Sequence, residues 1–132
     1  MNLASRLEGL TKIFGVEILI SEETLNSLTN VHSYSYRFLG RVTVKGKRQP
    51  IAIFEVFDSN PPPLIELKRQ TRTAFERGVN LYVEKQFTQA QQVFAQLWQW
   101  DDRDRVVLFY QERCQQAERS GVLEVDMIIP HP

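Results

Sequence analysis

Three consecutive prolines separate two parts of the chain that have different hydrophobic patterns. They end the stretch Asp58-Ser59-Asn60-Pro61-Pro62-Pro63. Prolines lack a backbone donor and favour extended structure, so we expect a Pro-rich linker at 59–63. The 132 residues then divide into a first part at 1–58, a second part at 64–121, and a tail at 122–132. The tail has no strong pattern, and whether it adds an extended segment is left open.

The first part begins with a helical pattern followed by a short strand. Apolar residues at three- and four-residue steps predict a helix over about 2–14 that stops at Gly15. The β-branched and apolar run 16–20 predicts a strand. Ser21 then has the side chain of a helix N-cap, which predicts a second, short helix through Leu28.

A β-hairpin follows in the same part. Apolar residues alternate from Tyr36 to Val44, a turn region lies at 46–50, and the run 51–57 is almost entirely apolar. Such a run is typical of a strand covered on both faces. The fold class is therefore α+β: one strand plus a hairpin with two helices, followed by an all-α segment. About 58 residues bury little surface, so we expect this part to belong to a larger domain.

The second part has the pattern of three helices. They are expected at 64–84, from Thr88 onward, and from Asp101 or Asp102 to about 119. Thr88 and Gln91 have the spacing of a capping box. The apolar sides of the three are Ala74, Phe75, Gly78, Leu81 and Tyr82; then Ala90, Val93, Phe94, Leu97 and Trp98; then Val106, Val107, Phe109, Tyr110 and Cys114.

Charge and composition exclude several classes of function. Lysine plus arginine and aspartate plus glutamate each number 16, so no net field attracts nucleic acid or an anionic membrane. No apolar run reaches the roughly 18 residues of a membrane span, and the N-terminus lacks a signal-peptide pattern. With Cys114 as the single cysteine, which we expect to be buried, a cytoplasmic protein is favoured. His32 and His131 have no second ligand at a suitable spacing, so no metal site is expected.

Four blocks of the first part resemble a known family. Their order and spacing resemble the C-terminal third of the class III adenylate/guanylate cyclase homology domain, over about residues 2–57. The blocks are Asn2 to Glu8, Gly15 to Ser21, Leu39 to Lys47, and Ile53 to Val56.

The resemblance implies roles for three residues. Asn2 would orient the ribose of the nucleotide, Arg6 would stabilise the transferring phosphate, and Lys45 would contact the triphosphate, with Lys47 ranked behind it. The chemistry is compatible, because residues four apart share a helix face and the guanidinium fork suits phosphate oxygens. Taken without the resemblance, Asn2 and Arg6 are an ordinary solvated helix start, and Lys45 is an ordinary turn residue.

The resemblance also implies what these residues lack. The family holds Mg²⁺ or Mn²⁺ with two aspartates, and selects the purine with further residues, all upstream of the asparagine motif with which this sequence begins. We therefore expect no cofactor bound by these residues and no cyclase activity from them alone. ATP and GTP both remain open as substrates of a complete site. In the family that site forms between two cyclase domains, so a dimer partner is a further expectation. A truncated gene, a misassigned start and a functional short protein all remain open.

The second part resembles a tetratricopeptide helix pair. The spacing of small and large residues carries this resemblance, at Gly78, Leu81, Ala90, Phe94 and Leu97. A groove for a protein partner and a plain helical appendix both remain open, and Trp98 and Trp100 would either anchor a partner or close the core. Three functions follow: an incomplete cyclase, an interaction or regulatory module, or a nonfunctional remnant with exposed apolar faces.

Overall fold

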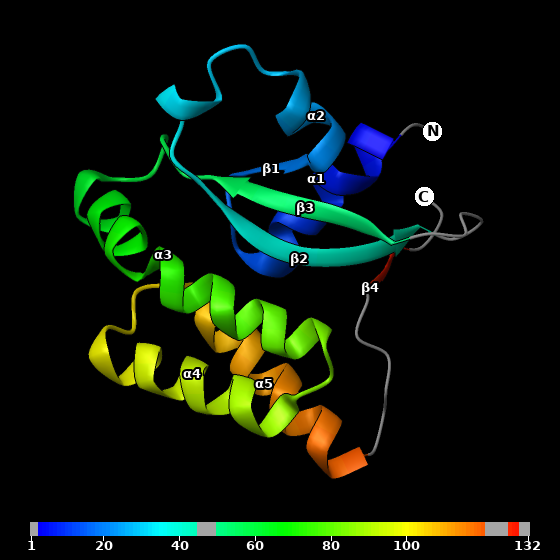
Figure 1. Cartoon of the computed structure of the whole chain (residues 1–132), viewed down its shortest axis with the longest axis vertical. Coiled ribbons are helices and arrows are strands. Elements are labelled where there is room, and N and C mark those ends of the chain that lie inside the picture. The colour runs from blue at the N-terminus through cyan, green and yellow to red at the C-terminus, as the bar shows by residue number, and fades with distance from the viewer. Residues whose placement is uncertain (1–2, 45–49, 121–126, 130–132) are drawn as a thin grey trace. The chain divides into compact units, whose positions relative to one another are not determined.

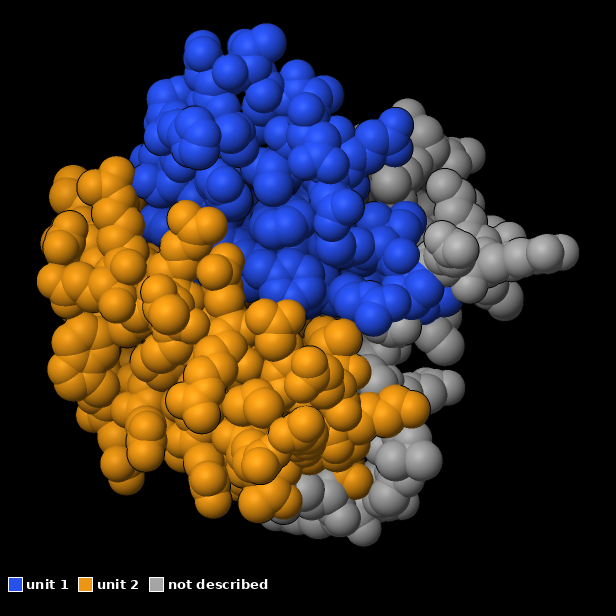
Figure 2. Space-filling model, viewed as in Figure 1, with its two compact units in different colours: residues 1–61, 126–132 blue, residues 62–125 orange. Residues whose placement is uncertain are grey.

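The structure is a computed structural model that divides into two compact units, coloured separately in Figure 2. It describes the backbone of residues 3–44, 50–120 and 127–129, and the side chains of residues 9–43 and 50–117. One unit comprises residues 1–61 and 126–132, and the other comprises residues 62–125. They are called the sheet unit and the helical unit below.

The sheet unit opens with α1 (Leu3–Phe14), which confirms the first predicted helix. The helix stops at Gly15, whose φ of 75° lies in the left-handed region that glycine enters without steric cost. The amides of Gly15 and Val16 both donate to the carbonyl oxygen of Thr11, at 2.9 and 3.0 Å. These two bonds satisfy a carbonyl group that the end of the helix would otherwise leave unpaired.

A capped short helix follows the first strand. Strand β1 (Ile18–Ser21) begins two residues later than the predicted run. The hydroxyl oxygen of Ser21 accepts a hydrogen bond from the amide of Thr24 at 3.2 Å, which makes Ser21 the N-cap of α2 (Glu22–Ser27). The predicted cap and its helix are both confirmed. A 3₁₀ turn, η1 (Val31–Ser33), leads on to the hairpin.

The predicted hairpin is confirmed as β2 (Tyr36–Val44) and β3 (Ile51–Val56), which pair antiparallel. The strand order is β1-β3-β2-β4, so β3 lies between β1 and β2 and is antiparallel to both (Figure 1). The register shifts between Phe38 and Gly40, and the φ of Gly40 is 142°. This β-bulge sits at a position that only glycine adopts easily.

The fourth strand comes from the tail that the sequence left open. Strand β4 (Met127–Ile129) pairs parallel with the end of β2, with Met127 opposite Val42. The sheet unit is therefore built from two chain segments, one that precedes the helical unit in the sequence and one that follows it. Its strands and helices, together with the helices that follow them, confirm the α+β class.

Apolar side chains from the helices and strands form the core of the sheet unit. The buried members are Leu10, Phe14, Val16, Leu25, Leu39, Val42, Ile53, Val56 and Phe57. Successive side chains of a strand point to opposite faces, so Ile53 and Val56 show that β3 has a buried residue on each face, as expected. The rings of Tyr36 and Phe38 contact Phe54 across the hairpin, with centroids 6.2 and 5.6 Å apart.

The helical unit contains α3 (Pro62–Val83), α4 (Phe87–Trp100) and α5 (Arg105–Ser120). Helix α3 begins at Pro62, so the expected extended spacer ends two residues earlier than 59–63 implies. Proline is tolerated in the first turn because an amide there has no helical acceptor. The break before α4 lies where it was expected, and Lys85 adopts a positive φ of 66° there.

Two expectations about helix starts are wrong. Thr88 does not cap α4, because the helix begins at Phe87 and its N-cap Gln86 makes no side-chain capping bond. The third helix does not start at Asp101 or Asp102, since Asp101 is the C-cap of α4. Instead, the carboxylate of Asp104 accepts from the amide of Val106 at 3.3 Å, and α5 begins at the residue between them.

The helices of this unit pack around aromatic rings and one close approach. A Cβ atom added to Gly78 would lie 2.9 Å from Cζ of Phe94 and 3.1 Å from Cγ1 of Val93, so α3 and α4 meet closely at Gly78. Ala74, expected on the apolar side, is exposed, and Val79 is buried instead. The buried aromatic side chains are Phe75, Tyr82, Phe87, Phe94 and Tyr110, and Cys114 is buried beside α5's other core residues, as expected.

Candidate functional site

The structure describes only part of the predicted site. Arg6 lies in α1, and its backbone is described. Asn2 and Lys45 lie outside the described residues, and so does Lys47. The predicted helix position of Arg6 is therefore confirmed, whereas the geometry that would join the three side chains stays a prediction.

One flank of α1 is open to solvent next to the position of Arg6. With 3.6 residues per turn, positions 6, 9 and 13 fall on the same side of the helix. A Cβ atom added to Gly9 would meet nothing within 4 Å, and the side chain of Ile13 is 54% exposed. The adjacent stripe, Leu10 and Phe14, is buried and fixes the helix to the unit. The described part of this flank, at Gly9 and Ile13, is thus exposed.

The predicted triphosphate contact, Lys45, follows β2 directly in the sequence. Residues 45–49 connect Val44, the last residue of β2, to the segment that enters β3 at Ile51. Figure 1 shows the first turn of α1 and this end of the hairpin toward the same end of the sheet unit. The unit is therefore compatible with a site built from both segments.

A buried ion pair lies in the same hairpin, near the end opposite the turn. Nε of Arg37 donates to Oε1 of Glu55 at 2.7 Å, and both side chains are fully buried. The two residues are direct partners in the β2–β3 register. Sequence reasoning missed this pair, although Glu55, the single charge inside the apolar run 51–57, was a signal that a basic partner should lie opposite it. A buried charge needs its partner, so the pair opposes any slip of the register that positions the hairpin tip.

Two acidic residues of the sheet unit, Glu17 and Asp58, accept structural hydrogen bonds. The carboxylate of Glu17 accepts from Asn60 Nδ2 at 3.0 Å and from Ser59 Oγ at 3.1 Å. The carboxylate of Asp58 accepts from the amide of Ser35 at 2.8 Å. These bonds tie the end of the unit's main segment back to earlier residues, so the acids have a structural task.

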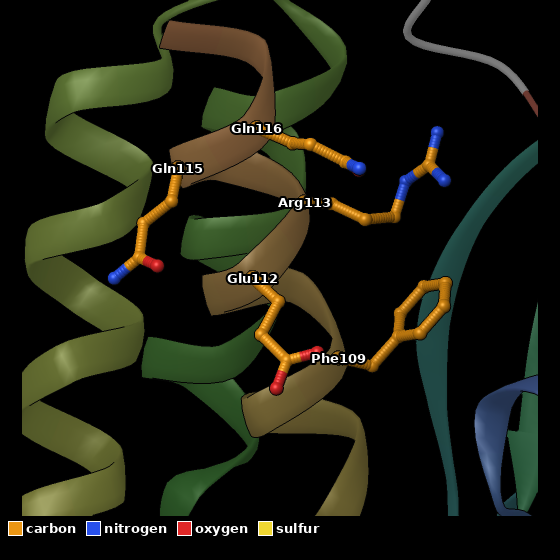
Figure 3. Close-up of a pocket in the computed structure, with 5 residues that line it drawn as sticks. All are labelled: Phe109, Glu112, Arg113, Gln115 and Gln116. Atoms are coloured by element: carbon orange, nitrogen blue, oxygen red, sulfur yellow. The ribbon is translucent and has the colours of Figure 1, made fainter. Parts of the chain in front are cut away.

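A hollow of about 400 Å³ lies along α5 in the helical unit (Figure 3). Its lining residues are Phe109, Glu112, Arg113, Gln115 and Gln116. Nε of Arg113 donates to the hydroxyl of Tyr82 at 3.0 Å, and the guanidinium carbon lies 5.7 Å from the ring centroid of Phe109. Arg113 thus has a packing role in this unit.

The described part of the chain has neither a cluster of metal ligands nor a helix suited to span a membrane. Within residues 3–44, 50–120 and 127–129, no three His, Cys, Asp or Glu side chains lie together as metal ligands would. His32 is exposed on η1, and His131 lies outside the described residues. No described helix combines the length and apolar content of a membrane span.

Comparison with known proteins gives two informative matches. The chain is 32% identical over 125 residues to "Adenylate cyclase, terminal-differentiation specific" of Dictyostelium discoideum, which covers 94% of this chain and 6% of that protein. It is 47% identical over 57 residues to "Adenylate cyclase" of Anabaena cylindrica, which covers 42% of this chain and 11% of that protein. No protein-family model and no solved structure matches it. The chain therefore spans a small part of each relative, and by its sequence it is related to adenylate cyclases.

Proposed function

We propose that the sheet unit supplies half of a nucleotidyl cyclase active site, as the C-terminal third of a class III cyclase domain. The reaction would convert ATP or GTP to a 3′,5′-cyclic nucleotide and pyrophosphate, for cyclic nucleotide signalling. The observation that carries the proposal is the match to an adenylate cyclase over 94% of the chain. The open flank of α1 at Gly9 and Ile13 supports it, because a nucleotide needs access to Arg6.

In this proposal each residue has one electrostatic or orienting task. Arg6 offers a planar fork of donors to the oxygens of the phosphoryl group, where negative charge develops during the reaction. Asn2 holds the ribose so that its 3′ hydroxyl faces the phosphorus atom. Lys45 at the hairpin tip neutralises part of the triphosphate. The buried Arg37–Glu55 pair acts indirectly, by keeping the hairpin in register.

The metal-binding half of such a site does not fit three acids described in the sheet unit. Glu55 is buried against Arg37, Glu17 is bonded to Ser59 and Asn60, and Asp58 is bonded to Ser35. We therefore derive no catalytic step through Mg²⁺ or Mn²⁺ on these residues. The proposal requires another cyclase segment to provide the metal ligands, so these 132 residues by themselves turn over no nucleotide.

Complementation tests the proposal directly. The chain is mixed with a cyclase domain that keeps its metal-binding aspartates but lacks its own transition-state arginine, and cyclic product from ATP and from GTP is measured with Mn²⁺. We expect product from the mixture and none from either protein alone. Arg6→Ala should abolish it. Lys12→Ala is the matched control, because Lys12 is exposed on another side of the same helix.

Failure of complementation would favour a second function, an interaction module built on tetratricopeptide-like helices. The specific observation behind it is again the Dictyostelium match, because 94% coverage of the chain extends far into the helical unit. A segment with no role would have no reason to accompany the sheet unit in a distant relative. On this reading, partner binding is indifferent to Arg6→Ala, and a folded chain without complementing activity is the expected result.

A further inference from the structure

Helix α4 differs from its neighbours in carrying no charge. Its sequence, FTQAQQVFAQLWQW, contains no Asp, Glu, Lys or Arg, although such residues make up 24% of the chain. Helices α3 and α5 each carry several charged residues. The surface of a solvated helix is normally charged, so the difference calls for a reason.

The uncharged residues form one continuous exposed row on the outer side of α4. Its members are Gln89, Gln92, Gln96, Gln99 and Trp100, and all of them are exposed. Steps of three and four residues place them within one stripe of the helix. The opposite side carries Phe87, Ala90, Phe94 and Leu97, which are buried in the helical unit. We call the exposed row the glutamine stripe.

Trp100 is an unusual residue for a solvent-exposed helix surface such as the glutamine stripe. It is 60% exposed, the largest value among the exposed large apolar residues in the described chain, and Trp98 near it is half-buried. Tryptophan is enriched at protein interfaces, while charged residues are depleted at their centres. The composition of the stripe therefore matches an interface more closely than a free surface.

We propose that the glutamine stripe is a self-association surface, and that its occupant is a second copy of this chain. Each glutamine amide is both a donor and an acceptor, so two identical rows can hydrogen-bond to each other. In a two-fold contact each residue of the row meets the same row of the partner, and a stripe without charges brings no like charges together. Nucleic acid or a charged peptide would require charged residues, which the stripe lacks.

The length of the helix sets the expected strength of the contact. Fourteen residues give a helix about 21 Å long, so a contact along it buries less than the roughly 1,200 Å² of a stable interface. We therefore expect a weak dimer, with a dissociation constant in the micromolar range or above. This inference gives the helical unit of the second candidate function a specific partner, and it does not rest on the cyclase proposal.

Sedimentation velocity of the full chain over a concentration series provides the test. Gln92→Lys combined with Gln96→Lys places like charges at the centre of the symmetric contact, and we expect at least a tenfold higher dissociation constant. Thr73→Lys combined with Asn80→Lys is the matched control. It adds the same charge to exposed positions on α3 and should leave the dimer unchanged. Both tryptophans lie in this helix, so their emission should shift to shorter wavelength as the dimer forms.

Charge complementation separates the proposed contact from a folding defect. A chain with Gln92→Glu and Gln96→Glu should be monomeric alone and should pair with the doubly lysine-substituted chain. A wild-type chain that stays monomeric at all concentrations would overturn the inference. So would a dimer that the lysine pair at 92 and 96 does not weaken more than the pair on α3, since the contact would then lie elsewhere. Neither result affects the complementation assay, in which the cyclase proposal stands or falls separately.

Discussion

The sheet unit and the helical unit keep their elements in place with different interactions. In the sheet unit, a hairpin with a fully buried ion pair, Arg37–Glu55, lies at the centre. In the helical unit, the close approach at Gly78 and a group of aromatic rings hold the helices together. An ion pair has strict geometric requirements, whereas aromatic packing depends on shape. The comparison teaches that the predicted catalytic residues belong to the unit in which an ion pair helps to fix the strand register.

The largest expected effect comes from breaking the buried pair. Glu55→Ala leaves the Arg37 guanidinium buried without its carboxylate, and we expect a loss of about 3–5 kcal/mol in the free energy of unfolding of the sheet unit. Urea unfolding followed by circular dichroism should show the loss. Tryptophan fluorescence reports on the helical unit alone, because both tryptophans are in α4, and its midpoint should stay in place.

Two results would change this comparison. The double variant Arg37→Leu with Glu55→Leu removes both charges and should lose much less stability than Glu55→Ala, as is usual for buried pairs replaced by apolar residues. An equal loss would mean that packing, and not charge, is what matters at this position. If Glu55→Ala moved the fluorescence midpoint as well, the two units would unfold as one.

A pair of glycines sharpens the contrast between tight and open helix surfaces. Gly78→Ala forces a methyl group against Phe94. The destabilisation from this overpacking, about 1–3 kcal/mol, should exceed the stabilisation of up to about 1 kcal/mol from the higher helix propensity of alanine. We expect a net destabilisation of the helical unit. Gly9→Ala in α1 meets nothing and should stabilise the sheet unit by about 0.5–1 kcal/mol. Thermal unfolding of both variants measures the difference, and effects of the same sign would contradict it.

A smaller effect is expected at the cap of α2. Ser21→Ala removes the acceptor for the Thr24 amide and should cost about 1 kcal/mol. Ser27→Ala on the same helix removes only an exposed bond to the Thr24 carbonyl, so its effect should be close to zero. Urea titration of the two variants gives the comparison. Equal midpoints would show that α2 contributes little to the sheet unit.

The smallest effect concerns the turn between α4 and α5. Hydrogen bonds from Arg103 hold the pKa of Asp101 below its ordinary value. Because the pKa of Asp101 is lower in the folded state, its ionised carboxylate stabilises the fold at pH values above the pKa of the unfolded state. This contribution is lost as the pH falls through the pKa of the folded state. Arg103→Ala should therefore raise the pKa of Asp101 in an NMR titration and slightly reduce stability at neutral pH. Because the pair is exposed, added salt should weaken the effect.

Local signals account for what the sequence predicted of the fold. Gly15, Ser21 and the alternation in 36–44 act over a few residues, and the helix stop, the cap and the hairpin followed from them. The starts of α4 and α5 were wrong because several polar residues compete to cap each helix. Of the three aspartates before α5, Asp104 accepts the bond from Val106, and Asp101 is the C-cap of α4.

Features that depend on distant residues were not predictable. The Arg37–Glu55 pair forms only in one register of the hairpin. The pairing of β4 with β2 joins β2 to a segment that follows the helical unit in the sequence. For the candidate site, the helix that carries Arg6 and the hairpin that leads to Lys45 were both foreseen. The open flank of α1 was not, because exposure at Gly9 and Ile13 depends on what the rest of the unit covers.

The parallel pairing of β4 with β2 has a consequence for how the protein forms during translation. The ribosome makes β1, β2 and β3 first, then all of the helical unit, and only afterwards β4. While the nascent chain grows, β2 keeps one row of backbone groups without its strand partner, a state that invites pairing with other chains. Strand β4 thus pairs with the Val42–Val44 end of this edge only after the three helices have been synthesised.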